Sequence, residues 1–188
     1  FAPFFAGVAI FCKLPIIDRN LPSSHWQNIE FIQEQFSAMP TVDEINQHLH
    51  EQIPMTSQMG IRVQSFSGEG VIATAPLKAN INHQQSAFGG SIAALGIVTG
   101  FVAIWGNLQL RTISAELVIQ HSETEFSKPG LGDMESRSRT LSDNALESFT
   151  TTLSENGTAR ILVTSDIFSD GKLIASNTGT FVAIVEND

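Results

Sequence analysis

Residues 79–110 contain no Asp, Glu, Lys or Arg, and residues 88–105 within this stretch are almost wholly apolar. A helix of this composition is stable only when protein or lipid covers it on most sides. Its length alone is compatible with a membrane span. Amphipathic strand patterns flank it, however, and glycines punctuate it at Gly89, Gly90, Gly96, Gly100 and Gly106. These features favour a helix buried in the core of a domain.

The composition of the chain excludes some classes of function. Of 188 residues, 19 are acidic and 10 are basic, which gives a net charge of −9. A field of this sign repels phosphate backbones, so we expect no nucleic-acid partner. Only 15% of the residues are charged, which favours a large core or an extensive subunit interface. The single cysteine, Cys12, excludes an internal disulfide and a cysteine-rich zinc site, and no metal site or cofactor is predicted.

The chain divides into an N-terminal extension of uncertain role, residues 1–40, and a domain, residues 41–188. Residues 26–36 within the extension carry apolar side chains at helical spacing. Residues 1–12 are apolar but lack a basic n-region and a small-residue cleavage site, and they are too short to cross a bilayer. We therefore expect a cytoplasmic protein without a membrane span.

The spacing of apolar residues predicts an α+β fold. Thr41 and Glu44 form a capping box ahead of a helix over residues 41–52. Strand patterns then alternate with turn signals, of which Asp170-Gly171 is the strongest hairpin signal. Strands are predicted at residues 61–66, 71–77, 112–126, 133–140, 161–168 and 173–185, and helices at 88–106 and 142–155. This order predicts an antiparallel sheet with one central helix.

The segment 76–91 carries the strongest functional signal. An amide-rich loop runs directly into Gly89 and Gly90 at the start of the apolar helix. The free N–H groups of a helix start carry partial positive charge, and glycine lets a substrate approach the backbone closely. Such a site stabilises an oxyanion forming on a carbonyl. The alternative is a tight helix entry in which the glycines serve packing only.

Other polar residues that could take part in catalysis also have a purely structural explanation. Ser91 follows two glycines, but the sequence lacks the strand and the complete motif of a nucleophile elbow, so a helix-start residue is predicted. His121, Glu123 and Glu125 alternate along the strand 112–126 and therefore share one sheet face. They form either a solvated face or an acid–base cluster.

Residues 45–185 resemble the hot-dog-fold thioesterases, and more closely the YiiD C-terminal thioesterase domain family. The resemblance rests on residues 53–55, 80–83, 87–91, 123–129, 169–173 and 179–181. It implies a hot-dog fold, in which a curved antiparallel sheet wraps around a long apolar helix. It also implies assembly through sheet edges into a homodimer or homotetramer.

The resemblance further implies hydrolysis of an acyl thioester, from acyl-CoA or acyl-carrier protein, to a carboxylate and a thiol in fatty acid metabolism. Carried onto this sequence, Gly89 and Gly90 offer N–H groups to the thioester carbonyl, and Asn82 orients the carbonyl or the water. Asn80, His83, Phe88 and Ser91 complete the predicted substrate-binding set.

One feature of the resembling family is missing. Its members often carry an Asp or Glu about two turns into the helix, whereas residues 96–99 here contain no carboxylate. We therefore predict His121, with Glu123, as the general base, because a neutral imidazole accepts a proton from water near pH 7. The alternatives are a non-catalytic acyl-thioester-binding protein and other thioester chemistry such as decarboxylation. Candidate cations for the CoA phosphates are Lys78, Lys128, Arg137 and Arg139.

Overall fold

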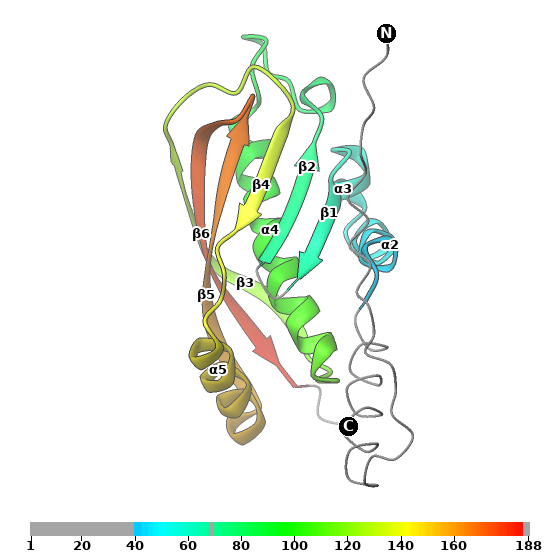
Figure 1. The fold of residues 1–188 in the computed structure, drawn as a ribbon, viewed down its shortest axis with the longest axis vertical. Helices are drawn as coiled ribbons and strands as arrows, with labels where there is room; N and C mark the ends of the chain where they lie inside the picture. Colours follow the sequence, from blue (N-terminus) through cyan, green and yellow to red (C-terminus); the bar gives the residue numbers. More distant parts are fainter. Residues whose placement is uncertain (1–39, 68–69, 186–188) are drawn as a thin grey trace, which may run out of the picture. The chain divides into compact units, whose positions relative to one another are not determined.

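The computed structural model describes residues 40–67 and 70–185, so the predicted helix over residues 26–36 lies outside the described residues. The elements are α2 (Val42–Gln52), α3 (Pro54–Gln58), β1 (Arg62–Ser67), β2 (Gly70–Ala75), the 3-10 turn η1 (Leu77–Ala79), α4 (Gly89–Leu110), β3 (Glu116–Phe126), β4 (Met134–Ser138), α5 (Asp143–Asn156), β5 (Thr158–Ser169) and β6 (Lys172–Ile184) (Figure 1). The strands form one antiparallel sheet in the order β1-β2-β4-β5-β6-β3.

Helix α4 lies in the core, and the sheet curves around it (Figure 1). It is long and apolar enough to cross a membrane, but 61% of its most apolar window is buried inside the fold. The sheet thus supplies the cover that the apolar sequence requires. This arrangement confirms the expected α+β hot-dog fold. Throughout, we call the sheet face that packs against α4 the inner face, and the opposite one the outer face.

The glycines of α4 let the sheet approach the helix closely. A Cβ on Gly96 would lie 2.6 Å from the Cβ of Asn177 on β6, and a Cβ on Gly100 would lie 3.0 Å from the ring of Phe181. Gly106 faces the ring of Phe66 in the same way, and the helix continues past it to Leu110 instead of ending there as predicted. These positions place a strand against the helix backbone with no room for a side chain.

The two edges of the sheet differ. At the β1 edge, the Asn46 side chain on α2 donates to the carbonyl of Val63 at 3.0 Å and accepts from its N–H at 2.8 Å. Helix α2 therefore closes this edge, and its predicted Thr41–Glu44 capping box is present. Strand β3 is the other edge, and among the described residues no strand pairs with its free side.

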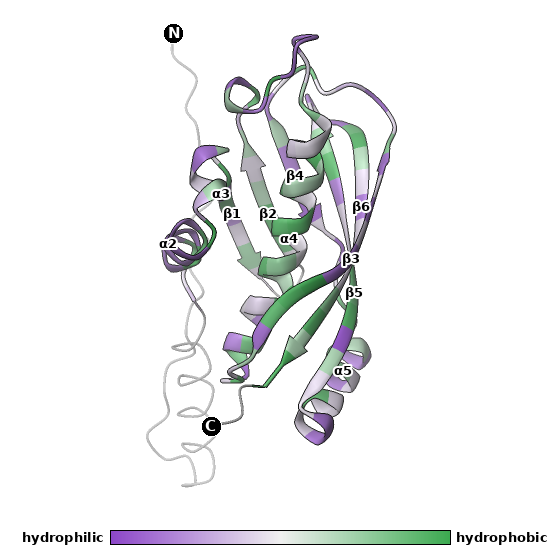
Figure 2. Cartoon of the chain, turned by 180° about the vertical axis from the view of Figure 1, so that it is seen from behind, coloured by the Kyte–Doolittle hydropathy of each residue, from purple (hydrophilic) through white to green (hydrophobic). Residues whose placement is uncertain are grey.

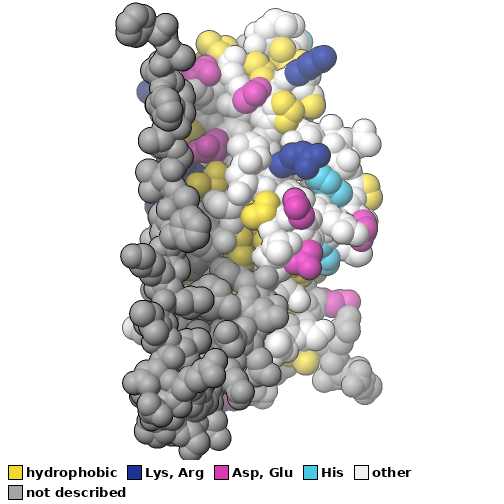
Figure 3. Space-filling view, turned by 45° about the vertical axis from the view of Figure 1, so that its right-hand side comes forward, with side chains coloured by type: hydrophobic (Ala, Val, Ile, Leu, Met, Phe, Trp, Pro, Cys, Tyr) yellow, Lys and Arg dark blue, Asp and Glu magenta, His cyan; other side chains and the backbone are white. Residues whose placement is uncertain are grey.

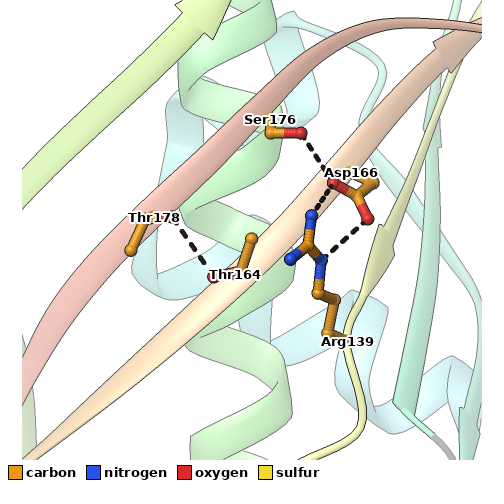
Figure 4. A network of polar contacts seen from close by, with 5 residues as sticks. All are labelled: Arg139, Thr164, Asp166, Ser176 and Thr178. Atoms are coloured by element: carbon orange, nitrogen blue, oxygen red, sulfur yellow. Dashed lines mark hydrogen bonds and ion pairs between the residues drawn. The ribbon is translucent and has the colours of Figure 1, made fainter.

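The outer face of β5 and β6 carries a polar network that includes Arg139, one residue beyond the end of β4 (Figure 4). Arg139 forms two hydrogen bonds of 2.9 Å with the Asp166 carboxylate, which also accepts a 2.7 Å bond from the Ser176 hydroxyl. The Arg139 hydrogen bond lowers the pKa of Asp166, and partial burial opposes this shift. The ion pair therefore favours the ionised carboxylate in the folded state.

Replacing Gly96 tests the close approach of α4 to β6. We expect Gly96→Ala to lower the free energy of unfolding by about 1–2 kcal/mol, because the clash with Asn177 outweighs the better helix propensity of alanine. Urea unfolding measures the difference. Gly89→Ala is the control, because its Cβ would make only an ordinary 3.6 Å contact with Phe126. A Gly96→Ala protein as stable as the wild type would contradict this packing.

The Asp166 ion pair predicts an acid-sensitive contribution to stability. A carboxyl with a lowered folded-state pKa stabilises the fold above its unfolded pKa of about 4, and this contribution disappears as the pH falls through the folded pKa. Arg139→Gln should therefore raise the pKa of Asp166 and destabilise the protein at pH 7 but not at low pH. Carboxyl NMR titration and unfolding at both pH values measure this. Arg160→Gln, on the same face but bound to Gln120, is the control, and an unchanged Asp166 pKa in Arg139→Gln refutes the prediction.

Candidate active site

The amino end of α4 presents free N–H groups. The N–H of Phe88, the N-cap residue, donates to the carbonyl of Asn80 at 2.8 Å, and the first helical bond runs from Ile92 to Phe88. Among the described residues, the N–H groups of Gly89, Gly90 and Ser91 have no hydrogen-bond partner. Gly90 is exposed and the other two are half-buried. This helix end can therefore donate hydrogen bonds to an incoming carbonyl oxygen or oxyanion.

The loop before α4 is held by its own asparagines. Asn80 is buried, and its Nδ2 donates to the carbonyls of Met59 and Pro76, each at 2.8 Å. The Oδ1 of Asn82 accepts from the N–H of Gln84 at 2.8 Å and of Ser86 at 3.2 Å. The structure thus places both predicted residues next to the helix start, where their side chains shape the loop.

The remaining residues predicted around this end are more open to solvent. His83 is exposed on the loop, and Phe88 is 55% exposed with its ring beside Gly90. The predicted binding residues from Asn80 to Ser91 therefore lie together around one helix end, as their nearness in sequence required.

Strand β3 contains a bulge that decides which side chains face α4. Ile119 pairs with Phe181 and His121 pairs with Thr180, so Gln120 is the extra residue. A bulge of one residue reverses the alternation of side chains between the two faces. His121 and Glu123 consequently lie on the outer face, although strict alternation from Ile119 would have placed them on the inner face. One subunit does not bring these two predicted residues to the amino end of α4.

The bulge instead brings three uncharged residues of β3 to the inner face. The ring of Phe126 lies 3.6 Å from the position of a Cβ on Gly89. Ser122 and Thr124 both accept hydrogen bonds from the Nδ2 of Asn177, at 2.8 Å and 2.7 Å. We call Ser122, Thr124 and Asn177 the polar strip. The sequence analysis predicted no role for Ser122, Thr124 or Asn177. Ser122 and Thr124 would have been expected on the inner face only if a bulge had been assumed in the predicted strand 112–126.

Two of the four candidate cations remain available to an anionic ligand. Arg137 pairs with Glu135 at 2.6 Å, and Arg139 is bound to Asp166. Lys78 and Lys128 are exposed and form no ion pair with any described residue. Lys78 lies in η1 just before the loop, and Lys128 lies two residues before Gly130, whose carbonyl accepts the N–H of Ala87. Both lysines therefore lie on segments joined to the start of α4.

Other surface features lie apart from this helix end. A cavity of about 1010 Å³ lies over the outer face of β1, β2, β4 and β5, with Arg62, Thr74, Arg137 and Phe168 in its lining. Figure 3 shows acidic, basic and histidine side chains interspersed on one side of the molecule, without a large area of one sign. Among the described residues, no group of three or more His, Cys, Asp or Glu side chains is placed to hold a metal ion.

Comparison with known proteins agrees with this geometry. Residues 42–185 match the family described as "Putative thioesterase (yiiD_Cterm)". The chain belongs to this YiiD C-terminal family. The predicted family, and with it the hot-dog thioesterase superfamily, is thereby confirmed.

Solved structures place the YiiD-type domain among proteins of the same fold. A protein from Shewanella oneidensis described as a "putative thioesterase" is 26% identical, and its structure matches with a TM-score of 0.69 over 76% of this chain and 96% of that chain. A protein of unknown function from Chlorobaculum tepidum TLS is 25% identical, with the same TM-score over 79% and 99%. A thioesterase from Haemophilus influenzae, at 17% identity and a TM-score of 0.59 over 77% and 91%, shares the fold.

Proposed function

We propose that this protein hydrolyses acyl thioesters and that acyl-CoA is its substrate. The observation that carries the proposal is the set of free N–H groups at Gly89, Gly90 and Ser91, at the amino end of the uncharged helix of a thioesterase-family domain. The unpaired Lys78 and Lys128 support CoA over a neutral thioester, because they offer positive charge to its phosphates close to the same end. Acyl-carrier protein is the alternative donor.

The geometry suggests how the hydrolysis proceeds. The thioester oxygen accepts hydrogen bonds from the N–H groups of Gly89 and Gly90, which polarise the carbonyl. Water adds to the carbonyl carbon and gives one proton to the solvent, and the helix end stabilises the oxyanion of the tetrahedral intermediate. The carbon–sulfur bond then breaks to give a carboxylic acid and the CoA thiolate. The thiolate takes up a proton from the solvent and the acid ionises, so that the products are a carboxylate and CoA. Asn82 acts by holding the loop that positions this helix end.

We propose that two copies of the chain form a homodimer through the open edge of the sheet. Strand β3 has an open edge, and its Val118, Ile119 and Phe126 side chains are 49%, 38% and 54% exposed. Figure 2 shows hydrophobic colour along part of β3. Pairing β3 with β3 of another subunit would satisfy the free backbone groups and cover apolar surface. The other edge is not available for such pairing, because Asn46 of α2 occupies it. A dimer acting on CoA esters in fatty acid metabolism fits a cytoplasmic location.

Turnover of a panel of thioesters tests the function. Purified protein is incubated with acyl-CoA esters, and with the same acyl groups on acyl-carrier protein, while a thiol reagent measures release. We expect Asn82→Ala to lower kcat/KM by about 10–100-fold, the range for a misplaced helix end. His121→Gln is the matched contrast. Because His121 lies on the outer face of β3, we expect its replacement to change kcat by less than about twofold. Removal of a general base would instead lower kcat by about 10²-fold or more.

Three other outcomes of this panel are informative. No release above the buffer rate from any ester would overturn the proposal. Binding of acyl-CoA without turnover would favour a non-catalytic binding protein, a function that the uncharged inner face also accommodates. A large loss of kcat in His121→Gln would mean that the outer face of β3 contributes the general base.

The edge of β3 predicts the oligomeric state. Analytical ultracentrifugation of the wild-type protein should give a dimer or a dimer of dimers. Val118→Lys places a charge on the outer side of the edge strand and should shift the protein to monomer at micromolar concentration. Leu162→Lys is the control, because Leu162 is 60% exposed on β5 in the middle of the sheet. A wild-type monomer would contradict the proposed pairing.

A further inference from the structure

The cavity over the outer face of the sheet has a row of four side chains across its floor. Arg62 on β1 pairs with Thr74 on β2, Thr74 with Glu135 on β4, and Glu135 with Phe168 on β5. All four line the cavity, which has a volume of about 1010 Å³. Neighbouring strands are about 4.8 Å apart, so the backbones of β1 and β5 are about 14 Å apart along this row. The floor is therefore long enough for a ligand with two separate binding groups.

The β1 end of this row carries an uncompensated positive charge. The Arg62 side chain is exposed, and no carboxylate of a described residue lies within ion-pair distance of its guanidinium. The nearby Gln64 and Thr74 are neutral, and their side chains bond to each other at 2.9 Å. A guanidinium presents several N–H donors in a planar fork that fits a phosphate or a carboxylate. This end can therefore bind one anionic group.

The β5 end of the row is a flat surface whose charge is compensated. The guanidinium of Arg137 lies over the Phe168 ring, 5.1 Å from the ring centroid. Glu135 binds the same guanidinium at 2.6 Å and 2.7 Å, which fixes its orientation and neutralises its charge. The Arg137 side chain is nevertheless 57% exposed. Guanidinium planes stack on heteroaromatic rings, so this end can bind a base rather than a second anion.

Acidic side chains limit the charge that a ligand of this cavity can carry. Asp133 lies directly before β4 and Asp170 directly after β5, and neither forms an ion pair with another described residue. The lining thus holds two positive and three negative side chains: Arg62, Arg137, Asp133, Glu135 and Asp170. One phosphate can use the free guanidinium of Arg62, whereas further phosphates would meet net negative charge. This balance favours a ligand with a single phosphate.

We propose that this cavity binds a nucleoside monophosphate, with its base stacked on Arg137 and its phosphate bound to Arg62. The distance between the two ends requires a spacer between ring and anion, which the ribose supplies. The cavity and α4 lie on opposite faces of the sheet, so this site is distinct from the proposed thioester site and does not depend on it. Pro76 lines the cavity, and its carbonyl accepts a hydrogen bond from Asn80. A bound nucleotide would therefore contact a residue that also supports the loop before α4.

Matched probes test the proposal by calorimetry. The probes are AMP, adenosine, which lacks the phosphate, and ribose 5-phosphate, which lacks the base. We expect a Kd for AMP below about 1 mM, and at least about tenfold tighter binding of AMP than of either fragment, because each end contributes to affinity. ATP, which has more phosphates, should bind more weakly than AMP. No binding of AMP, or equal binding of AMP and ribose 5-phosphate, would overturn the proposal.

Variants assign the two ends of the ligand. Arg62→Gln changes an exposed side chain and should weaken AMP by at least about tenfold while leaving the affinity for adenosine unchanged. Arg137→Gln should weaken AMP and adenosine alike, because it removes the stacking surface. Arg160→Gln is the control, because Arg160 lies on the outer face outside the cavity and is bound to Gln120. Unchanged AMP affinity in Arg62→Gln would contradict the assignment.

Amide NMR of the wild-type protein locates the bound nucleotide. AMP should shift the N–H signals of Thr74 and Phe168, which lie on the floor of the cavity. Shifts confined to Gly89 and Gly90 would place the phosphate at the start of α4 instead and would refute the cavity site. CoA, which carries three phosphate groups, should leave the Thr74 and Phe168 signals unchanged. These results do not depend on turnover, so a failure of the proposed thioesterase function would leave them interpretable.

Discussion

The structure depends on the burial of α4, a helix that is apolar around its whole circumference. A single packing partner cannot cover such a helix, so the sheet curves around it and α2 adds cover through the stacking of His48 on Trp105. The strands come close because α4 has glycine where they approach, above all at Gly96 and Gly100. Burial of the helix and curvature of the sheet are thus one constraint, and they leave the N–H groups of Gly89, Gly90 and Ser91 free at the helix start.

The same close contact restricts the chemistry of the site. Gly96 lies two turns into the helix, where the resembling thioesterases often carry a carboxylate, and the Cβ of Asn177 occupies the space that such a side chain would need. At this level of α4 the polar groups are on the sheet, in the polar strip, rather than on the helix. They are neutral hydroxyls and an amide that can hydrogen-bond oxygen atoms, and neither α4 nor the inner-facing Ser122, Thr124 and Phe126 of β3 supplies a charged base.

Local patterns predicted most of the fold because they depend on neighbours in sequence. The capping box at Thr41 and the Asp170-Gly171 hairpin are both present where the sequence places them. The short helix α3 was missed, because its five residues, of which the first is Pro54, span little more than one helical turn and show no recognisable period. The anchoring of β1 by Asn46 was also missed, since it joins residues 17 apart in the chain through one side chain.

The sequence by itself determined a buried glycine-punctuated helix, an amide-rich loop at its start, and a strand on which His121 and Glu123 share a face. It left open which face that is, because alternation along a strand is a relative property. Only pairing with β6 decided it, through the extra residue Gln120, which turns Ser122 and Thr124 toward α4 and the two titratable side chains away from it. A register is set by contacts between distant segments, and for that reason it becomes visible only in the folded chain.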